Sequence, residues 1–308
     1  MRTFFSKLLA FLFLYFIVDY GIGFLLSTVY ADIEKGDIGR NNYITNNLTD
    51  KDILIFGSSR AIHHYDPDII GDSLSMTCYN CGDDGMGIIL NYARLQAILS
   101  RYTPKLIIYD IEPGFDIERN DNLRYLGKLK PYYPKYNLQP IFNSVSDREQ
   151  YKMLSQLYRY NSQLFDILIQ RLSSSTLTAR DYKYAPLDKT MDYEPEPIPF
   201  SPYEVDSLKV KYLKSFIKEC NKKGVTLFLT ISPKYKNTTE LDLNPIIGEN
   251  NLNVRVISHY ADSAFNFRKQ LFVDQNHLNK NGAIIYSNCI ASEIIKDLSM
   301  NYRTAERR

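Results

Sequence analysis

The stretch KDILIFGSSRAIHHY, residues 51–65, predicts a buried strand that turns sharply into a helix. Residues 53–56 are all apolar, which is typical of a strand covered on both faces. Gly57 follows, and glycine adopts positive φ and lets another backbone approach closely. Ser59 therefore lies between the carboxyl end of a strand and the start of a helix, where open α/β sheets place their ligands. Serines at such a turn also serve simply as helix caps.

A second stretch, LFVDQNHLNKNGA at residues 271–283, contains the two residue types that activate a serine. A serine hydroxyl is a weak nucleophile at neutral pH and needs an adjacent base. An imidazole serves as that base when a carboxylate fixes its tautomer. Asp274 precedes His277 by three residues, so the two side chains can lie on one face of a single turn. With Ser59 they predict a Ser-His-Asp triad, although Asp and His are also common in exposed polar loops.

Together the two stretches resemble the sequence blocks of the SGNH (GDSL-like) hydrolases. In that family the nucleophile block follows the first strand, and Gly57-Ser58-Ser59-Arg60 stands in its place here. The family's D-x-x-H block near the C-terminus matches Asp274 and His277. The resemblance implies that Ser59 is the nucleophile, His277 the base and Asp274 the acid that orients it. It also implies a three-layer α/β/α, flavodoxin-like sandwich.

The resemblance further implies how an oxyanion would be held. Segment 80–85, NCGDDG, has the family's N-x-G-x-x-G form, so the N–H groups of Gly85 and Ser59 are the implied oxyanion donors. The family's third block supplies an Asn after the next strand, but here that strand leads into DIEPG at residues 110–114. Losing one oxyanion donor costs on the order of 100-fold or more in rate. The missing Asn is therefore also compatible with a non-catalytic protein that has the same fold.

Strand-like and helix-like segments alternate along much of the chain, which predicts a doubly wound parallel sheet of about five strands. The predicted strands are residues 53–56, 74–80, 105–111, 225–231 and 253–257. The βα rhythm stops between residues 115 and 200, which we interpret as an insertion that forms a lid or substrate groove. The α/β domain is thus predicted at residues 51–300, followed by a polar tail at 301–308.

Residues 1–31 predict a membrane anchor. Arg2 and Lys7 precede a largely apolar run at residues 8–29, which is long enough to cross a bilayer. The basic residues before the run place the N-terminus in the cytoplasm and the rest of the chain outside, in the periplasm or at the cell surface. A cleaved signal peptide is the alternative, and it would export the same domain. Residues 32–50 are polar and are predicted to be a linker.

Asp19 lies near the middle of the apolar run. An ionisable residue inside a membrane is costly and suggests a partner or a functional role. One hypothesis is that Asp19 packs against a membrane protein with several spans, such as an acyl-donating transporter or transferase. The alternative is that its side chain is protonated or reaches the membrane interface.

Composition argues against several other functions. The 308-residue chain has a net charge of +2 and no long basic run, so nucleic acid is not an expected partner.

Cys78 and Cys81 form a C-x-x-C spacing, but no second close pair of ligands accompanies them, so neither zinc nor another cofactor is expected. A disulfide among the four cysteines is compatible with export, but the sequence does not define its pairing. His63 and His64 are interpreted as packing or surface residues rather than metal ligands.

The sequence thus predicts a membrane-anchored serine esterase or O-acyltransferase that acts on acyl or acetyl esters of an extracytoplasmic glycan or envelope polymer. A chain with these features resembles the membrane-anchored SGNH-like proteins of bacterial envelopes, including the accessory acyltransferases of D-alanylation and glycan O-acetylation. Three alternatives stay open. One is a non-catalytic accessory or assembly protein of an envelope acylation complex. Another is a transferase that works only with a membrane partner. The third is an α/β-hydrolase, since Gly57-x-Ser59-x-Ala61 fits its nucleophile elbow, but there the acid and the His do not share one loop.

Overall fold

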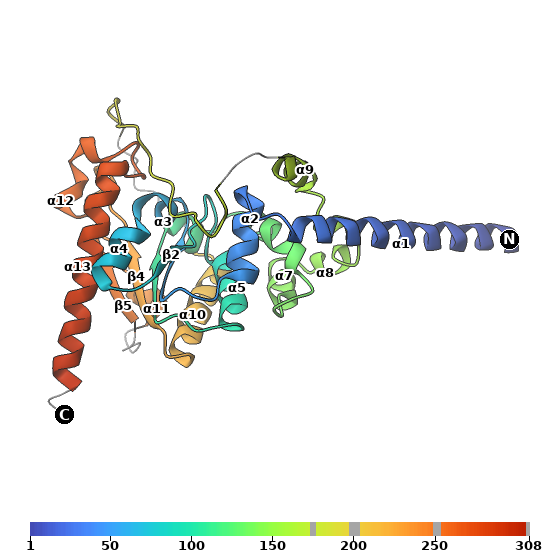
Figure 1. Ribbon diagram of the computed structural model, residues 1–308, viewed down its shortest axis with the longest axis horizontal. Helices are drawn as coiled ribbons and strands as arrows, with labels where there is room; N and C mark the ends of the chain where they lie inside the picture. The colour runs from blue at the N-terminus through green and yellow to red at the C-terminus, as the bar shows by residue number, and fades with distance from the viewer. Residues whose placement is uncertain (173–176, 197–203, 249–253, 306–308) are drawn as a thin grey trace. The chain divides into compact units, whose positions relative to one another are not determined.

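The computed structural model describes residues 1–172, 177–196, 204–248 and 254–305. The chain forms two compact units (Figure 1). The first comprises Met1–Leu48 and Asp121–Tyr182, and the second comprises Thr49–Asn120 and Lys183–Arg308. All the predicted site residues belong to the second unit.

The second unit is built on a five-stranded parallel sheet with the strand order β2-β1-β3-β4-β5. Its strands are β1 (Ile53–Gly57), β2 (Cys78–Asn80), β3 (Leu106–Asp110), β4 (Thr226–Ile231) and β5 (Val254–Ser258). Helices flank the sheet, which confirms the predicted α/β class (Figure 1). The order reverses at β1, whose neighbours β2 and β3 lie on opposite sides of it. The carboxyl end of β1 is therefore at the topological switch point, where such sheets bind ligands.

Alternating side chains of the strands pack on two helical layers, because successive residues of a strand face opposite sides. Ile53 and Ile55 of β1 share a core with α3 (Ser59–His64), α4 (Pro67–Leu74) and α13 (Lys280–Ala305). On the other face, Phe56 and Tyr109 pack edge-on against Phe216, with ring centroids 5.6 and 5.0 Å apart. Phe216 belongs to α10 (Ser207–Lys222), which packs beside α5 (Ile88–Leu99). β1 is therefore buried on both faces, as its uninterrupted apolar run predicts.

The predicted strands differ from the observed ones mainly at their ends. The largest difference is β2, which begins at Cys78 because α4 extends through Leu74. Pro67 occupies the first turn of α4, and the Asp66 carboxylate caps it by accepting the N–H groups of Asp68 and Ile69. Asn253, the predicted first residue of the fifth strand, lies outside the described residues. The remaining helical segments of this unit are short: α6 (Pro113–Asp116), α11 (Asn244–Ile247), α12 (Ser263–Asn266) and η4 (Lys269–Leu271).

The described part of the first unit contains helices joined by turns and loops, and no β-strand. Its elements are α1 (Arg2–Ala31), α2 (Gly36–Asn42), η1 (Tyr43–Asn47), η2 (Asn122–Tyr132), α7 (Gln139–Val145), α8 (Glu149–Lys152), η3 (Leu157–Arg159) and α9 (Leu164–Leu172). Residues 32–50, whose polar composition predicts a linker, instead include α2 and η1. Asn42 is buried there, where it donates to the Tyr30 carbonyl at 2.7 Å and accepts the Tyr132 hydroxyl at 2.7 Å. Hydrogen bonding lets such polar side chains pack inside, so composition alone is misleading here.

The segment predicted to be one insertion, residues 115–200, is divided between the two units. Its residues 173–176 and 197–200 lie outside the described part of the chain. Its role as a lid or substrate groove stays a prediction. The predicted tail at 301–308 begins within α13, which runs to Ala305, and residues 306–308 are not described.

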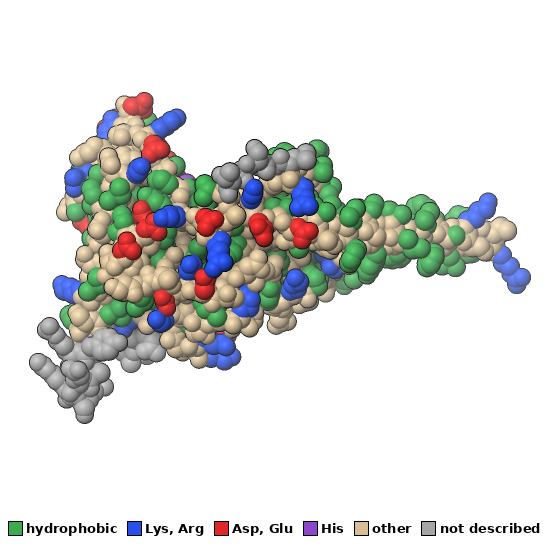
Figure 2. All heavy atoms as spheres, in the orientation of Figure 1, with side chains coloured by type: hydrophobic (Ala, Val, Ile, Leu, Met, Phe, Trp, Pro, Cys, Tyr) green, Lys and Arg blue, Asp and Glu red, His purple; other side chains and the backbone are tan. Residues whose placement is uncertain are grey.

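α1 is long and apolar enough to cross a membrane, and it is the one such helix among the described residues. Its 30 residues span about 45 Å, more than the roughly 30 Å of a bilayer's hydrocarbon core. Large apolar side chains from Phe4 to Leu25 are exposed, and Figure 2 shows green side chains along the visible face of the N-terminal helix. Apolar side chains exposed on all sides are what a bilayer covers. The orientation of this helix stays a prediction.

Asp19 of α1 is bonded within the first unit. Its side chain is only 1% exposed, and its carboxylate accepts the Ser155 hydroxyl at 2.6 Å. The same carboxylate accepts the N–H groups of Gln156 and Leu157 at 2.7 and 3.2 Å. These bonds supply the partners that an ionisable residue on a membrane helix requires. Contact between Asp19 and a second membrane protein stays a prediction, and the structure offers this intramolecular explanation for the residue.

Replacing Gly23 by Ala is expected to loosen the contact between α1 and residues 155–157. A Cβ at Gly23 would lie 2.2 Å from the Cβ of Gln156, so one of the two segments has to move. Overpacking of this kind typically costs about 1–3 kcal/mol. Limited proteolysis of the full chain in detergent micelles should therefore cut near Gln156 at least about fivefold faster in the variant.

Gly21 provides the matched control for this experiment. A Cβ at Gly21 meets nothing within 4 Å, so Gly21→Ala should be cut at the wild-type rate. Equal cleavage of the Gly21→Ala and Gly23→Ala variants would show that the contact at Gln156 does not hold the segment in place.

Candidate active site

Ser59 is the first residue of α3, and a single residue, Ser58, separates it from the carboxyl end of β1. The turn depends on Gly57, whose φ is +141°, a value that residues with a side chain rarely adopt. A Cβ at Gly57 would also lie 2.7 Å from the Asp110 carbonyl oxygen of the neighbouring strand. β1 therefore passes close to β3 and then turns into the helix, which brings Ser59 to the switch point of the sheet.

The structure brings the three predicted triad residues together, although 218 positions separate Ser59 from His277. His277 Nε2 lies 2.9 Å from Ser59 Oγ. His277 Nδ1 lies 3.0 and 2.9 Å from the two carboxylate oxygens of Asp274. Since a carboxylate only accepts, this arrangement places the imidazole proton on Nδ1 and leaves Nε2 free to accept the Ser59 hydroxyl proton. This is the arrangement in which a histidine can act as general base toward a serine.

Asp274 is held in its charged form. Burial acts to raise the pKa of its carboxyl, but the hydrogen bond and charge of His277 and the N–H groups of Asn276 and His277 outweigh it, so the pKa lies below its ordinary value. Asp274 Oδ1 accepts those two N–H groups at 2.7 and 2.9 Å. Two backbone N–H groups of the loop thus hold the Asp274 carboxylate in place, and this carboxylate in turn orients the imidazole of His277.

His64 supports the loop that carries His277. Its Nε2 accepts the backbone N–H of Leu278 at 3.0 Å, and Leu278 forms an antiparallel bridge with Phe272. Burial, with the nearby charges of His277 and Arg60, puts the pKa of His64 well below its ordinary value, so the ring is neutral and can accept. His64 therefore has the packing role that the sequence suggests, and it couples α3 to the Asp274–His277 turn.

His63 lies closer to the triad than the sequence indicates. Its ring centroid is 5.8 Å from that of His277. Its Nδ1 lies 2.5 Å from the Ala185 carbonyl oxygen and its Nε2 lies 3.0 Å from Asp84. Both neighbours are acceptors, so both ring nitrogens carry protons when these bonds are made. Burial opposes the charged ring, but the bonds to Asp84 and Ala185 prevail and raise the pKa of His63.

The loop after β2, which contains Gly85, is fastened against the start of α3. The Asn80 side-chain amide donates to the Ala61 carbonyl at 2.7 Å, and the N–H of Asp83 donates to the Gly57 carbonyl at 3.2 Å. Gly85 has a φ of +66°, and its N–H donates to no backbone carbonyl among the described residues. These features make the Gly85 N–H available to a ligand. Its role as an oxyanion donor beside the N–H of Ser59 stays a prediction.

A buried cation lies beside the residues that end and follow β3. The side chain of Arg60 is 1% exposed, and it pairs with Asp110 at 3.4 Å and with Glu112. It also donates to the carbonyl oxygens of Ile111 and Ser232. Burial disfavours its charge, but the two carboxylates outweigh burial and raise the pKa of Arg60. Arg60 thereby holds the ends of β3 and β4 beside the turn that carries Ser59.

Asp110 extends this buried network to α13, which packs on the same face of the sheet as α3. Its Oδ1 accepts the Tyr65 hydroxyl at 2.7 Å, the Ser232 hydroxyl at 2.5 Å and the Ser232 N–H at 3.0 Å. The Tyr65 hydroxyl in turn lies 3.1 Å from that of Tyr286 on α13. Burial raises the pKa of Asp110 despite the nearby Arg60 guanidinium. In the sequence, Arg60 adjoins Ser59, and the acidic residues Asp110 and Glu112 come at the end of the next strand. These positions alone do not show that the arginine pairs with the two carboxylates.

Comparisons with known proteins return distant similarities alone. No protein-family model and no curated protein matches the chain. One similar solved structure, provisionally described as a platelet activating factor from Streptococcus pneumonia, is 13% identical and aligns over 84% of this chain and 88% of that one, with a TM-score of 0.39. Another, provisionally described as a lipolytic protein of the G-D-S-L family from Desulfitobacterium hafniense DCB-2, is 10% identical over 78% of this chain and 97% of that one, with a TM-score of 0.38. Similarity of this degree carries no argument about the chemistry of this chain.

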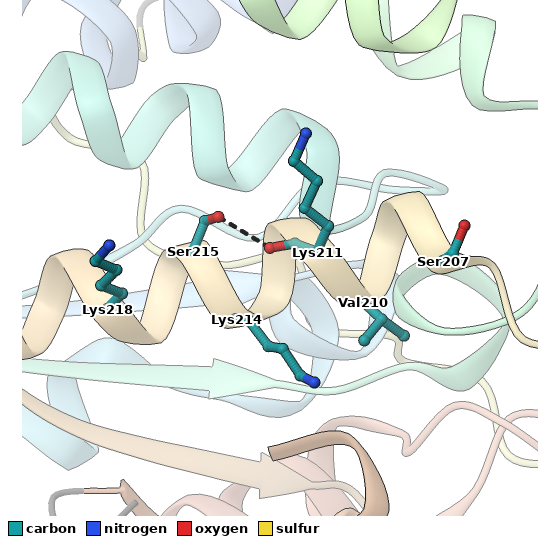
Figure 3. A pocket seen from close by; sticks show the side chains of 6 residues that line it. All are labelled: Ser207, Val210, Lys211, Lys214, Ser215 and Lys218. Atoms are coloured by element: carbon teal, nitrogen blue, oxygen red, sulfur yellow. Dashed lines mark hydrogen bonds between the residues drawn. The ribbon is translucent and has the colours of Figure 1, made fainter. Parts of the chain in front are cut away.

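Two further features of the second unit lie apart from the triad residues. A hollow of about 420 Å³ runs along α10 and is lined by Ser207, Val210, Lys211, Lys214, Ser215 and Lys218 (Figure 3). All of its lining residues belong to α10, so none of the three triad residues lines this hollow.

All four cysteines are described and are free thiols, so the C-x-x-C pair forms no disulfide here.

Proposed function

We propose that the chain is an SGNH-like serine esterase or O-acyltransferase that forms an acyl-enzyme on Ser59. The observation that carries this proposal is the hydrogen-bonded series from Ser59 Oγ to His277 Nε2 at 2.9 Å and from His277 Nδ1 to Asp274 at 2.9 Å. An activated serine requires a base within hydrogen-bond distance and a group that orients the base. Both requirements are met, and the serine lies at the switch point of the sheet.

In the proposed reaction His277 Nε2 takes the Ser59 proton while Oγ attacks the carbonyl carbon of an ester. The N–H groups of Ser59 and Gly85 would stabilise the resulting oxyanion. Collapse of the tetrahedral intermediate breaks the ester bond, and the departing alcohol takes the proton from His277. Water then releases the acyl group in an esterase, whereas a sugar or polyol hydroxyl accepts it in an O-acyltransferase. Asp274 holds the imidazole in one orientation throughout.

The location of the site supports an envelope substrate. α1 has the length and composition of a membrane span, and basic residues precede its apolar run. If the N-terminus is cytoplasmic, the α/β unit is extracytoplasmic, in the periplasm or at the cell surface. Esters on a glycan or another envelope polymer are the acyl compounds that fit this location. A membrane protein with several spans would be the partner that supplies the acyl donor.

Labelling with a fluorophosphonate tests for an activated serine without knowledge of the substrate. The full chain in detergent micelles should be labelled, and Ser59→Ala and His277→Ala should both abolish labelling. Ser58→Ala is the matched control. Ser58 is the adjacent serine, it is buried, and its hydroxyl has no hydrogen-bond partner among the described residues. This variant should label like the wild type.

The opposite result favours the alternative function. If the folded wild-type chain resists labelling, or if Ser59→Ala still labels, Ser59 is not activated. A non-catalytic accessory or assembly protein of an envelope acylation complex then explains the fold and the missing third-block Asn better.

A further inference from the structure

Three side chains with metal-binding atoms converge beside the last strand of the sheet, outside the triad. His259 follows the carboxyl end of β5, and Cys289 and Glu293 lie one turn apart on α13. His259 Nε2 lies 3.2 Å from Glu293 Oε1 and 3.8 Å from Cys289 Sγ. Cys289 Sγ lies 3.8 Å from Glu293 Oε1. The three donor atoms are therefore within 4.8 Å of one another.

The spacing of these atoms matches one face of a zinc tetrahedron. Bond lengths of about 2.0–2.2 Å to nitrogen and oxygen and about 2.3 Å to sulfur give tetrahedral edges of about 3.4 Å for N···O and about 3.6 Å for edges that end at sulfur. The three observed distances of 3.2, 3.8 and 3.8 Å lie close to these edges. A single ion can thus contact all three atoms with small side-chain movements.

His259 is held with the correct nitrogen toward the other two ligands. Its Nδ1 lies 2.7 Å from the Asp262 carboxylate, and the Asp262 side chain also caps α12 through the N–H of Ala264. With the proton on Nδ1, the lone pair of Nε2 faces Cys289 and Glu293. A carboxylate that fixes the rear nitrogen is the usual second partner of a metal-binding histidine.

The surroundings of His259 keep the ring in this position. His259 is 5% exposed, and its backbone N–H donates to the Ile231 carbonyl at 2.9 Å. The rings of Phe265 and Tyr286 pack edge-on against the imidazole, with centroids 5.9 and 5.5 Å away. In a neutral imidazole the Nε2 lone pair points at a carboxylate oxygen only 3.2 Å away. A cation between the two atoms replaces this repulsion with coordination.

We propose that this cluster binds one zinc ion through His259 Nε2, Cys289 Sγ and Glu293 Oε1. Glu293 is 41% exposed, so water can reach the fourth position. The thiolate favours zinc over magnesium or calcium, which prefer oxygen ligands. Binding displaces the thiol proton and joins α13 to the loop that follows the edge strand β5. Inspection of close ligand pairs in the sequence misses this site, because Cys289 lies 30 residues from His259.

Cobalt(II) binding tests the site in the full chain, purified in detergent micelles and stripped of metal with a chelator. Cobalt(II) replaces zinc in such sites, and a thiolate ligand adds a strong near-ultraviolet charge-transfer absorption. The wild type should bind one equivalent with this absorption, and Cys289→Ala should lose it. Cys220→Ala is the matched control, because Cys220 is a buried cysteine on α10, away from the cluster, and this variant should keep the absorption. Retention in Cys289→Ala, or absence in the wild type, would overturn the proposal.

Alkylation of the unaltered protein gives a second test that needs no variant. Saturating zinc should slow the reaction of Cys289 with iodoacetamide by more than about tenfold, because the free thiolate is the reactive form. Peptide mass spectrometry reports the rates at each cysteine separately, and Cys78, which is also partly exposed, serves as the internal reference. Equal slowing of Cys78 and Cys289, or no slowing of Cys289, would contradict a zinc site at this position.

Discussion

Replacing Asp274 by Asn is expected to slow fluorophosphonate labelling of Ser59 by about 10⁴-fold, the loss that the same change causes in a serine protease. An Asn can keep its carbonyl oxygen on the N–H groups of Asn276 and His277, which Asp274 Oδ1 accepts at 2.7 and 2.9 Å. Its NH2 group then faces His277 Nδ1, which has to accept a hydrogen bond. The imidazole proton moves to Nε2, and Nε2 can no longer take the proton of Ser59.

The labelling rate of the folded variant checks this expectation, and the thermal midpoint shows whether the fold is intact. Asp68→Asn is the matched control, because Asp68 is an exposed carboxylate of the same unit that pairs with Lys183. It should label at the wild-type rate. A rate for Asp274→Asn within about tenfold of the wild type would mean that Asp274 does not set the tautomer of His277.

The proximity of Ser59, His277 and Asp274 could be predicted from the sequence because each segment has a local signal. An apolar run that ends in Gly57-Ser58-Ser59 indicates a strand and a turn, and Asp274 and His277 lie within one turn of chain. The βα alternation predicts that both segments reach the same edge of a parallel sheet. The five strands follow from the same local patterns. The short strand β2 has the start that the sequence places furthest from the observed one, because α4 continues to Leu74.

The contacts that the sequence did not reveal depend on tertiary pairing. Arg60 meets Asp110 only because β1 and β3 are neighbours in the sheet. Asp19 is bonded to the segment that begins at Ser155, 136 residues away, and no periodicity connects the two. A polar stretch such as residues 32–50 is typical of a linker unless its buried amides find partners, and composition does not show whether they do.

Replacing Arg60 by Met is expected to lower the free energy of unfolding by about 3–5 kcal/mol, because the change leaves a buried carboxylate without its cation. Asp110 is fully buried and keeps only uncharged donors from Tyr65 and Ser232 in the variant. The carbonyl oxygen of Ile111 also loses the guanidinium. Urea unfolding of the full chain in detergent micelles, followed by circular dichroism, measures the difference.

The pH dependence of this loss separates an unpaired charge from simple loss of packing. Burial already raises the pKa of Asp110 above its ordinary value of 3.8, and removal of Arg60 raises it further. The folded variant then binds a proton that the unfolded chain releases, so its stability falls as the pH rises above 3.8. The difference in unfolding free energy between the wild type and Arg60→Met should therefore become smaller as the pH is lowered toward 3.8. Loss of packing alone would leave the deficit independent of pH.

Arg119→Met is the matched control, since it removes an ion pair of the same kind from the surface of the same unit. Arg119 and Glu204 lie 2.5 Å apart with side chains 66% and 68% exposed. Exposed pairs typically contribute about 0–1 kcal/mol, so this variant should unfold within about 1 kcal/mol of the wild type at every pH. An equally small loss in Arg60→Met would mean that water or protonation of Asp110 fully replaces the guanidinium. The Ser59 turn would then not depend on this buried charge for its support.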